Sequence, residues 1–294
     1  LAAVLKKNKY PIRVFDMGLE LNDYKLTQTI KDFQPDLIGI TMFSYCYDQA
    51  YRMIVKVKKE FKNIPLIVGG PHVSATKNEI LKEAPVDFAM RGEGEASFLD
   101  FLKELSSAKS NFMMVPNLIW RRGKQIIVNS DKPLIKNLDE LPFPDYESFG
   151  LERYPCFKTK TLPLLTSRGC PYGCTYCSVR LSMGRGFRPR SPENVLDEIE
   201  YWYKKDFVNF DINDDCFTLD LNRAKRICEL IIKKKLKIHF QLYNGIRVDR
   251  IDLELLKKLK KAGCTFIAYG CEAGNERILK SINKGISLQQ VKTA

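Results

Sequence analysis

Three cysteines, Cys170, Cys174 and Cys177, stand close together in the stretch CPYGCTYC. Cysteine thiolates bind zinc and iron–sulfur clusters, and a site supplied by protein alone normally has four ligands. A zinc site would call for a second C-x-x-C pair or for histidines. The chain has two histidines, His72 and His239, and neither has ligand spacing to the triplet. The pattern therefore favours a [4Fe-4S] cluster on three cysteines, with one iron open to another ligand.

The triplet directly follows the apolar run TLPLLTS, which reads as a β-strand, residues 161–167. Gly169, Pro171 and Gly173 supply the turns that let one short loop place three sulfurs around a cluster. When strands alternate with helices, the loops after the strands carry the chemistry. This loop is therefore the predicted active-site loop.

The last part of the chain repeats strand-then-helix units, which predicts a barrel or open barrel. The expected strands are 161–167, 207–212, 237–243 and 265–270, and the expected helices are 192–204, 220–235, 252–262 and one beginning near Asn275. Only four strands are visible, so we expect the rest of the barrel beyond Ala294. The chain also opens inside a helical pattern, which suggests a preceding segment.

The first part alternates β-branched runs with helical periods and predicts a doubly wound, flavodoxin-like α/β unit. The expected strands are 12–16, 36–41, 65–70 and 86–90, and helices are expected to start near Tyr24, Asp48, Ala75 and Glu95. Between the two parts, residues 117–128 predict a β-hairpin that turns at Arg122–Gly123, followed by a proline-rich connection. The predicted boundaries are 1–105, a linker at 106–160, and 161–294.

The composition is that of a globular enzyme, with 45% hydrophobic and 28% charged residues among 294. No apolar run approaches the roughly 18 residues of a membrane span, so a cytoplasmic protein is expected. Of the nine cysteines, the six outside the triplet are scattered along the chain, which favours buried small side chains over disulfides. The net charge of +13 is spread along helical segments as a solvated basic surface, and a nucleic-acid partner is not expected.

The C-x-x-x-C-x-x-C spacing, with the aromatic Tyr176 before the last cysteine, resembles the signature of the radical S-adenosylmethionine (SAM) superfamily. The resemblance implies that the amino and carboxylate groups of SAM bind the fourth iron, with Tyr176 beside the adenine. It also implies reductive cleavage of SAM to a 5′-deoxyadenosyl radical, which abstracts hydrogen from a small-molecule or peptide substrate. A reductant such as flavodoxin or ferredoxin would supply the electron.

Three further stretches are similar to SAM-contacting segments of this superfamily. FDINDDCFT offers Asp214 and Asp215 to the SAM ammonium group, NGIRVDRID offers Arg247, and the Gly-x-Glu-x-Gly segment in YGCEAGNE offers Glu272 to the ribose hydroxyls. The residues alone leave other roles open. Helix capping suits one of the aspartates as well, and a structural salt bridge suits Arg247 or Glu272.

The first part of the chain, in YPIRVFDMGLELNDYKLTQTIKDFQPDLIGIT and PLIVGGPHVSATKNEILKEAPVDFAMRGEGEASF, resembles the cobalamin-binding domain of the B12-dependent branch of the superfamily. The resemblance implies that Thr41 and Ser44 lie near the nucleotide tail of cobalamin, and that Gly69 and Gly70 let the tail pass. The loop that carries a cobalt-ligating histidine in some cobalamin proteins would precede Leu1. His72 is read as a turn residue.

The resulting hypothesis is a cobalamin-dependent radical SAM enzyme for methyl transfer, or for radical cyclisation or rearrangement, with no catalytic residue assigned beyond the cluster ligands. One alternative is a tRNA methylthiotransferase. Such enzymes resemble an architecture whose first domain brings three cluster cysteines of its own, whereas residues 1–105 contain only Cys46. Another alternative is a non-catalytic cobalamin or redox sensor.

Overall fold

The computed structural model of the chain describes residues 1–19 and 23–294. It divides into two compact units. The first comprises Leu1–Ile135, Pro144–Phe149 and Leu181–Met183, and the second comprises Lys136–Phe143, Gly150–Arg180 and Gly184–Ala294. In the part of the chain that is described, no helix has both the length and the apolar character needed to cross a membrane.

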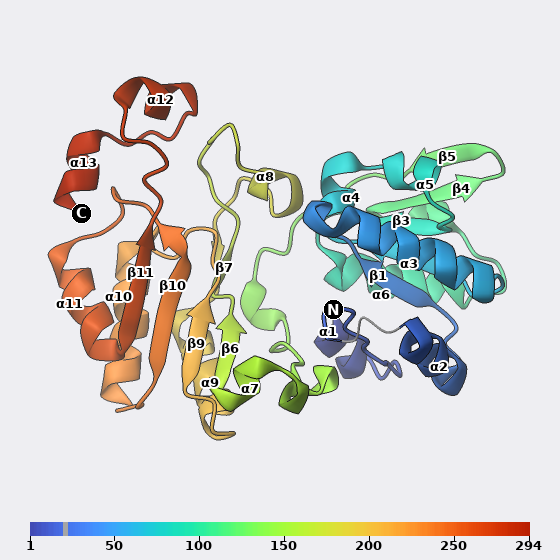
Figure 1. Cartoon of the computed structure of the whole chain (residues 1–294), viewed down its shortest axis with the longest axis horizontal. Coiled ribbons are helices and arrows are strands. Elements are labelled where there is room, and N and C mark those ends of the chain that lie inside the picture. The colour runs from blue at the N-terminus through green and yellow to red at the C-terminus, as the bar shows by residue number, and fades with distance from the viewer. Residues whose placement is uncertain (20–22) are drawn as a thin grey trace. The chain divides into compact units, whose positions relative to one another are not determined.

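The first unit is built on a five-stranded sheet with the order β1-β2-β3-β4-β5 (Figure 1). Strands β1 (Ile38–Thr41), β2 (Leu66–Gly69) and β3 (Phe88–Met90) are parallel. Strands β4 (Leu118–Arg122) and β5 (Gln125–Val128) form the predicted hairpin, which turns through Gly123 in a left-handed conformation with φ 61°. Strand β4 pairs antiparallel with β3, so the hairpin is part of this sheet.

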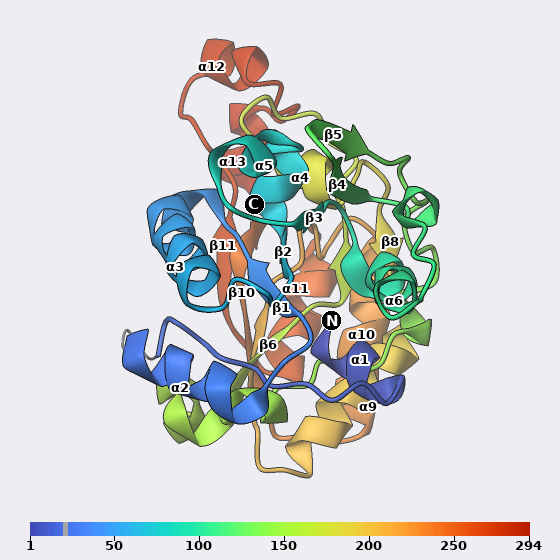
Figure 2. The ribbon, with the colours of Figure 1, turned by 90° about the vertical axis from the view of Figure 1, so that its right-hand side faces the viewer.

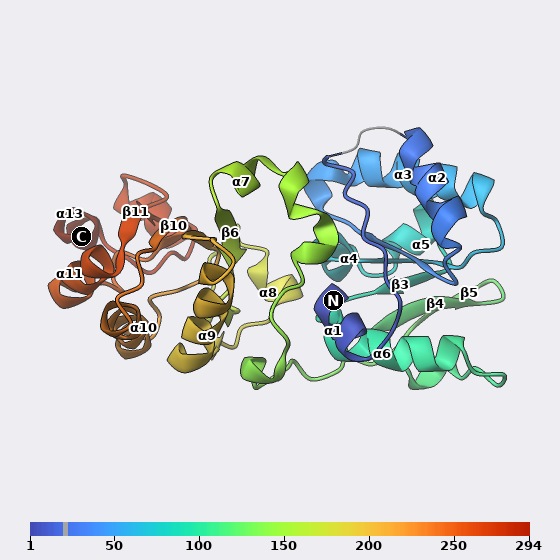
Figure 3. The same ribbon diagram turned by 90° about the horizontal axis from the view of Figure 1, so that it is seen from below.

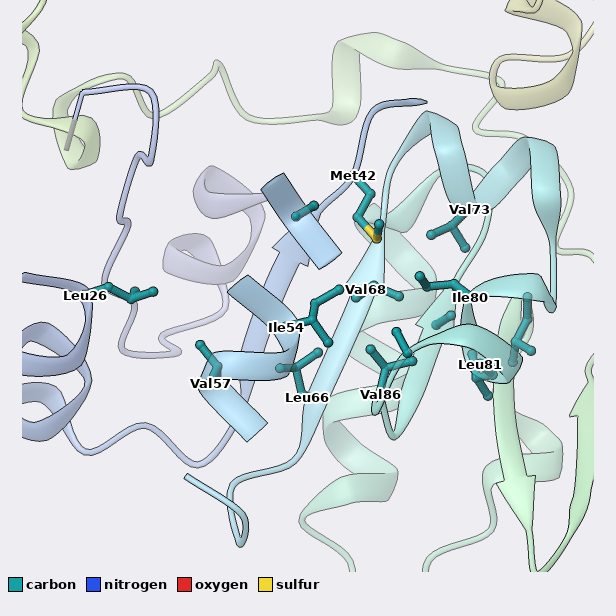
Figure 4. Close-up of a cluster of buried hydrophobic side chains, with 14 of the residues drawn as sticks. Leu26, Met42, Ile54, Val57, Leu66, Val68, Val73, Ile80, Leu81 and Val86 are labelled. Carbon is teal, nitrogen blue, oxygen red and sulfur yellow. The ribbon is translucent and has the colours of Figure 1, made fainter. Parts of the chain in front are cut away.

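Helices cover both faces of the first sheet. They are α1 (Ala2–Lys7), α2 (Asp23–Phe33), α3 (Tyr47–Glu60), α4 (Pro71–Thr76), α5 (Glu79–Glu83) and α6 (Gly94–Leu105). Successive residues of a strand face opposite sides. Leu66 and Val68 of β2 accordingly pack with Ile54 of α3 (Figure 4), whereas Ile67 packs with Phe101 of α6. Figure 2 shows α3 and α6 on opposite faces of β1–β3.

The strand predicted at residues 12–16 is wrong, because this segment is irregular and makes no strand pairing. Its Phe15 is partly buried against the core cluster that contains Ile54 and Leu66. The apolar pattern therefore reports burial of a side chain. It does not by itself provide the neighbouring backbone that a strand needs.

The second unit contains a four-stranded parallel sheet with the order β11-β10-β9-β6. The strands are β6 (Thr161–Leu164), β9 (Asn209–Ile212), β10 (His239–Ile246) and β11 (Cys264–Tyr269), and they confirm the four predicted strands. Helices α9 (Pro192–Tyr203), α10 (Leu221–Lys233) and α11 (Leu253–Ala262) cover one face (Figure 3). Each begins at a side-chain cap, Ser191, Asp220 or Asp252.

Two helices, α12 (Glu276–Ser281) and α13 (Leu288–Thr293), lie beyond the carboxyl ends of these strands (Figure 1). The connection that precedes β6 contains the 3₁₀ turns Leu138–Glu140, Glu147–Phe149 and Leu151–Arg153, and the short helix α7 (Pro155–Lys158).

The cysteine loop, defined as residues 169–187, begins and ends at a small antiparallel ribbon. Strand β7 (Ser167–Arg168) pairs with β8 (Arg188–Pro189), and helix α8 (Val179–Ser182) lies within the loop. The ribbon therefore fixes both ends of the loop near the carboxyl end of β6.

The side chain of Asp214 holds the segment between β6 and β7 in place through hydrogen bonds. It is 2% exposed, and one carboxylate oxygen accepts a hydrogen bond from the Thr166 amide at 2.5 Å. The other oxygen accepts from the Thr166 and Ser167 hydroxyls at 2.5 and 2.6 Å. Burial raises the pKa of Asp214 above its usual range, against these bonds. Asp214, two residues beyond the end of β9, thus holds the chain that enters the cysteine loop.

We expect Asp214→Ala to destabilise the protein by about 3 kcal/mol, because each buried donor left without an acceptor costs roughly 1–3 kcal/mol. Asp214→Asn should cost less, since an amide oxygen still accepts from Thr166 and the hydroxyls can turn to accept from the amide. Urea unfolding of the cluster-free protein measures both. Equal stability of Asp214→Ala and the wild type would contradict the anchoring role.

The carboxyl end of α11 requires a glycine, Gly263, both for its backbone conformation and for lack of space. Gly263 has φ 102°, and a Cβ there would collide with the carbonyl oxygen of Ile238. Gly263→Ala should lower stability by more than the roughly 1–3 kcal/mol of backbone strain alone. Gly94→Ala is the control, because Gly94 stands in α6 with no atom near its would-be Cβ. A thermal midpoint unchanged in Gly263→Ala but lowered in Gly94→Ala would reverse this assignment.

Candidate functional site

The three cysteines of the loop form a donor set suited to a cluster. Cys174 is buried, and Cys170 and Cys177 are partly exposed. Within the described ranges, no group of three or more His, Cys, Asp or Glu side chains is arranged around a single metal ion. A cubane cluster needs no such convergence, because each thiolate binds a different iron. Three thiols on one loop fit a [4Fe-4S] cluster better than a zinc ion.

Contacts with later parts of the chain hold the backbone of the cysteine loop. The Asn283 side chain donates to the Gly173 carbonyl at 3.0 Å, and the Thr175 amide donates to the Ile282 carbonyl at 3.0 Å. A Cβ on Gly173 would lie 2.9 Å from the Asn283 amide nitrogen, so a side chain at this position would displace the Asn283 amide. At the base of the loop, the Gly169 amide donates to Asp215 at 2.8 Å.

Tyr172 lies between two arginines. The Arg247 guanidinium stacks 3.6 Å from the centre of the Tyr172 ring, and Arg250 donates to the Tyr172 hydroxyl at 2.7 Å. Arg247 is 7% exposed and pairs with Asp249 at 2.8 Å. The salt bridge left open for Arg247 by the sequence is therefore present, and this arginine supports the loop from beneath Tyr172.

The surroundings of Cys170 favour its thiolate. A hydrogen bond with the thiol of Cys216, together with the Tyr172 amide and the Arg247 charge, lowers the pKa of Cys170 to about 6. Cys216 is 2% exposed, and its hydrogen bond to Cys170 and its burial raise its own pKa. Because the thiolate is the form that binds iron, Cys170 is prepared for the role that the sequence predicts.

A second group of side chains lies beside the loop. Lys284 donates to Glu272 at 2.7 Å and to the Tyr176 hydroxyl at 3.3 Å. Lys284 lowers the pKa of Glu272, with a smaller contribution from Tyr176. Burial raises the pKa of Tyr176, and so does its hydrogen bond with Glu272. The structure thus brings together two of the predicted SAM residues, Tyr176 and Glu272, around a lysine that the sequence did not single out.

The two predicted SAM aspartates, Asp214 and Asp215, have different partners. Asp215 is partly buried at the base of the cysteine loop, where burial raises its pKa. Asp214 points into the interior, and both of its oxygens are used by Thr166 and Ser167. Asp214 therefore uses three of its acceptor sites for the segment that enters the cysteine loop. Asp214 thus has a structural role, and its contact with the SAM ammonium group stays a prediction.

The four predicted cobalamin residues all lie at the carboxyl ends of β1 and β2. Thr41 and Ser44 are exposed, and Ser44 is hydrogen-bonded to His72 at 3.0 Å. Gly70 has φ 99°, and its Cβ would lie 2.8 Å from the Met42 carbonyl, so packing of the chain itself requires this glycine. A Cβ on Gly69 would make only an ordinary 3.4 Å contact. Folding alone therefore does not explain Gly69.

The same edge offers groups that fit a large polar cofactor. The exposed hydroxyls of Thr41 and Ser44 can donate to amide or phosphate oxygens. The exposed rings of Phe43 and Tyr45 stack with their centres 5.4 Å apart and add an apolar surface. His72 lies in the first turn of α4, and its amide donates to the Met42 carbonyl at 3.2 Å; it is thus a helix residue, whereas the sequence predicted a turn there and a helix start near Ala75.

Residues 164–294 match the model of the Radical SAM superfamily, and residues 1–102 match that of the B12 binding domain. The chain is 31% identical over 99% of its length to an uncharacterized methyltransferase of Pyrococcus horikoshii. It is 29% identical over its whole length to the anaerobic magnesium-protoporphyrin IX monomethyl ester cyclase of Rubrivivax gelatinosus. The chain spans 64% and 54% of the lengths of these relatives.

The fold is also that of a solved structure, the cobalamin-dependent S-adenosylmethionine radical enzyme OxsB with aqua-cobalamin and S-adenosylmethionine bound. The TM-score is 0.84 at 24% identity, over 98% of this chain and 42% of that one. Both matched domains occur here in the order that the sequence predicted. The chain therefore belongs to the B12-binding branch of the radical SAM superfamily, whose cofactors are a [4Fe-4S] cluster, SAM and cobalamin.

Proposed function

We propose that the protein is an enzyme that cleaves SAM reductively at a [4Fe-4S] cluster and uses cobalamin to act on a small-molecule or peptide substrate. The observation that carries the proposal is the cysteine loop, fixed at the carboxyl end of β6, with Tyr176, Glu272 and Lys284 beside it. A bound cluster with SAM supplies the electron transfer and the 5′-deoxyadenosyl radical, and the protein supplies position and charge.

The side chains have separate tasks in this proposal. Cys170, Cys174 and Cys177 hold the cluster. Glu272, kept ionised by Lys284, accepts hydrogen bonds from the ribose hydroxyls of SAM. Tyr176 is 53% exposed and offers its ring to the adenine.

Two further residues act at the base and support of the loop. Asp215 accepts a hydrogen bond from the Gly169 amide at the base of the loop, and it receives the SAM ammonium group. Arg247 supports the loop through Tyr172, and its charge favours the Cys170 thiolate.

The carboxyl edge of the first unit holds cobalamin in this proposal. Thr41 and Ser44 donate to its nucleotide tail, and Gly69 lets the tail pass close to the backbone. Two curated relatives are named a methyltransferase and a cyclase, and we propose one of these two outcomes for this chain, with flavodoxin or ferredoxin as reductant and the cytoplasm as location. A second cluster of the methylthiotransferase type has no cysteine set, because residues 1–135 contain only Cys46.

Cys174→Ala should abolish both the cluster and SAM cleavage, since it removes one of three ligands. The protein is reconstituted anaerobically with iron and sulfide and given SAM and dithionite. Bound iron and released 5′-deoxyadenosine are then measured. Cys228→Ala is the control, because Cys228 is a buried cysteine of α10 outside the loop.

Two outcomes would change the proposal. A full-length, cluster-loaded wild type that releases no 5′-deoxyadenosine would exclude the enzyme and favour the redox or cobalamin sensor. Cys174→Ala with a full complement of iron and sulfide would remove the cysteine triplet from the cluster. With substrate present, S-adenosylhomocysteine beside 5′-deoxyadenosine marks methyl transfer, and its absence marks cyclisation or rearrangement.

Gly69→Ala should weaken cobalamin binding about ten-fold, the effect of roughly 1.4 kcal/mol lost where the tail approaches the backbone. Equilibrium dialysis with hydroxocobalamin measures the affinity. Because its Cβ meets no close neighbour, the variant should unfold at the wild-type temperature, whereas Gly70→Ala should be destabilised with or without cobalamin. Wild-type affinity in Gly69→Ala would place the tail elsewhere, and no binding by the wild type would remove the cobalamin assignment.

A further inference from the structure

Lys284 is a lysine with almost no exposure to solvent. Its exposed fraction is 6%, whereas buried lysines are rare unless they are paired, since a desolvated ammonium group is costly. Its partners are the Glu272 carboxylate at 2.7 Å and the Tyr176 hydroxyl at 3.3 Å. Both are residues that the proposed function places against SAM. The ammonium group of Lys284 therefore connects the cysteine loop to the segment after β11.

The backbone around Lys284 connects the same parts of the second unit. The Lys284 carbonyl accepts from Arg247 at 2.8 Å, and the Gly285 carbonyl accepts from Arg247 at 3.2 Å. On the other side, Ile282 and Asn283 bond to the cysteine loop at Thr175 and Gly173, on either side of Cys174. The segment of residues 282–285 thus contacts the cysteine loop and the chain that follows β10 and β11.

The geometry of Glu272 fits a carboxylate that is held for a ligand. Its φ is 64°, a left-handed conformation that is uncommon for residues other than glycine, asparagine and aspartate. Gly270 leaves room for the ion pair, because a Cβ there would lie 3.0 Å from the Lys284 nitrogen and 3.2 Å from a Glu272 oxygen. The Glu272 side chain keeps 34% of its exposure, while that of Lys284 keeps 8%. The carboxylate is therefore accessible and the lysine behind it is not.

We propose that Lys284 is a positioning residue for SAM. It acts through Glu272 and Tyr176, setting the direction of the carboxylate that receives the ribose hydroxyls and of the ring that lies beside the adenine. This inference rests on the proposed function, since it assumes that SAM binds beside the cluster. Lys284 thus contributes to the affinity for SAM, whereas the three cysteines alone bind the cluster.

The test measures SAM binding directly, without turnover. Full-length wild type, Lys284→Met, Lys284→Arg and Glu272→Gln are loaded anaerobically with the cluster, and iron content and the visible spectrum confirm loading. Equilibrium dialysis with radiolabelled SAM then gives the affinity. The EPR signal of the reduced cluster is recorded during a SAM titration. Lys280→Met is the matched control, because Lys280 is an exposed lysine of α12 near the same segment.

We expect Lys284→Met to bind SAM about ten-fold more weakly, the scale of one lost charge-assisted contact, and to need correspondingly more SAM to change the EPR signal. Lys284→Arg should recover part of the affinity, and Lys280→Met should match the wild type. If Lys284 acts through Glu272, the double variant with Glu272→Gln should lose less than the sum of the two single losses.

The outcomes separate the inference from the function on which it rests. Wild-type affinity in cluster-loaded Lys284→Met overturns the positioning role and leaves the enzyme proposal standing, and additive losses in the double variant overturn the action through Glu272. If Lys284→Met does not load a cluster, Glu272→Gln decides, because wild-type affinity in that variant also overturns the inference. A cluster-loaded wild type that binds no SAM refutes the proposed function itself.

Discussion

The buried carboxylate of Asp214 is the contact on which the candidate site depends. It accepts from the amide and hydroxyl of Thr166, and the Thr166 carbonyl in turn accepts from Arg223 at 2.6 Å and from the Arg190 amide at 2.9 Å. Asp214 thus satisfies the amide and hydroxyl of Thr166, and two arginines satisfy its carbonyl. Because Thr166 stands immediately before β7, the cysteine loop starts from a point that cannot shift without exposing or stranding buried polar groups.

The sequence allowed the frame of the second unit and the cluster ligands to be predicted. Strands and helices differ in the period of their apolar residues, which can be read from the sequence. The spacing of three cysteines on one loop indicates a cluster in the same way. The sequence also indicated Asp214 and Asp215 as candidates, but it did not show which of the two side chains faces the interior. Asp214 is directed to the interior by its bonds to Thr166, 48 positions away, and a sequence pattern does not display that contact.

Lys284 and Tyr172 illustrate what a single sequence does not display. Lys284 meets Tyr176 across 108 positions, and Tyr172 meets Arg250 across 78. Read linearly, the lysine looks like one more charge at the end of a helix in a chain of 48 basic residues. Its burial follows from how α12 and the segment after it return to the loop. In the first unit the same limit applies to Gly69 and Gly70, which look alike until the Met42 carbonyl is found beside only one of them.

The cysteine loop is shaped by contacts that protein groups alone provide, through Gly169, Tyr172, Gly173 and Thr175. In small zinc domains, by contrast, the metal drives folding and its removal unfolds the chain. Here we expect iron and sulfide to bind to a loop whose backbone is already held in place by the protein. Loss of the cluster to oxygen would then leave the loop in place, and iron and sulfide could bind again without new synthesis of the chain.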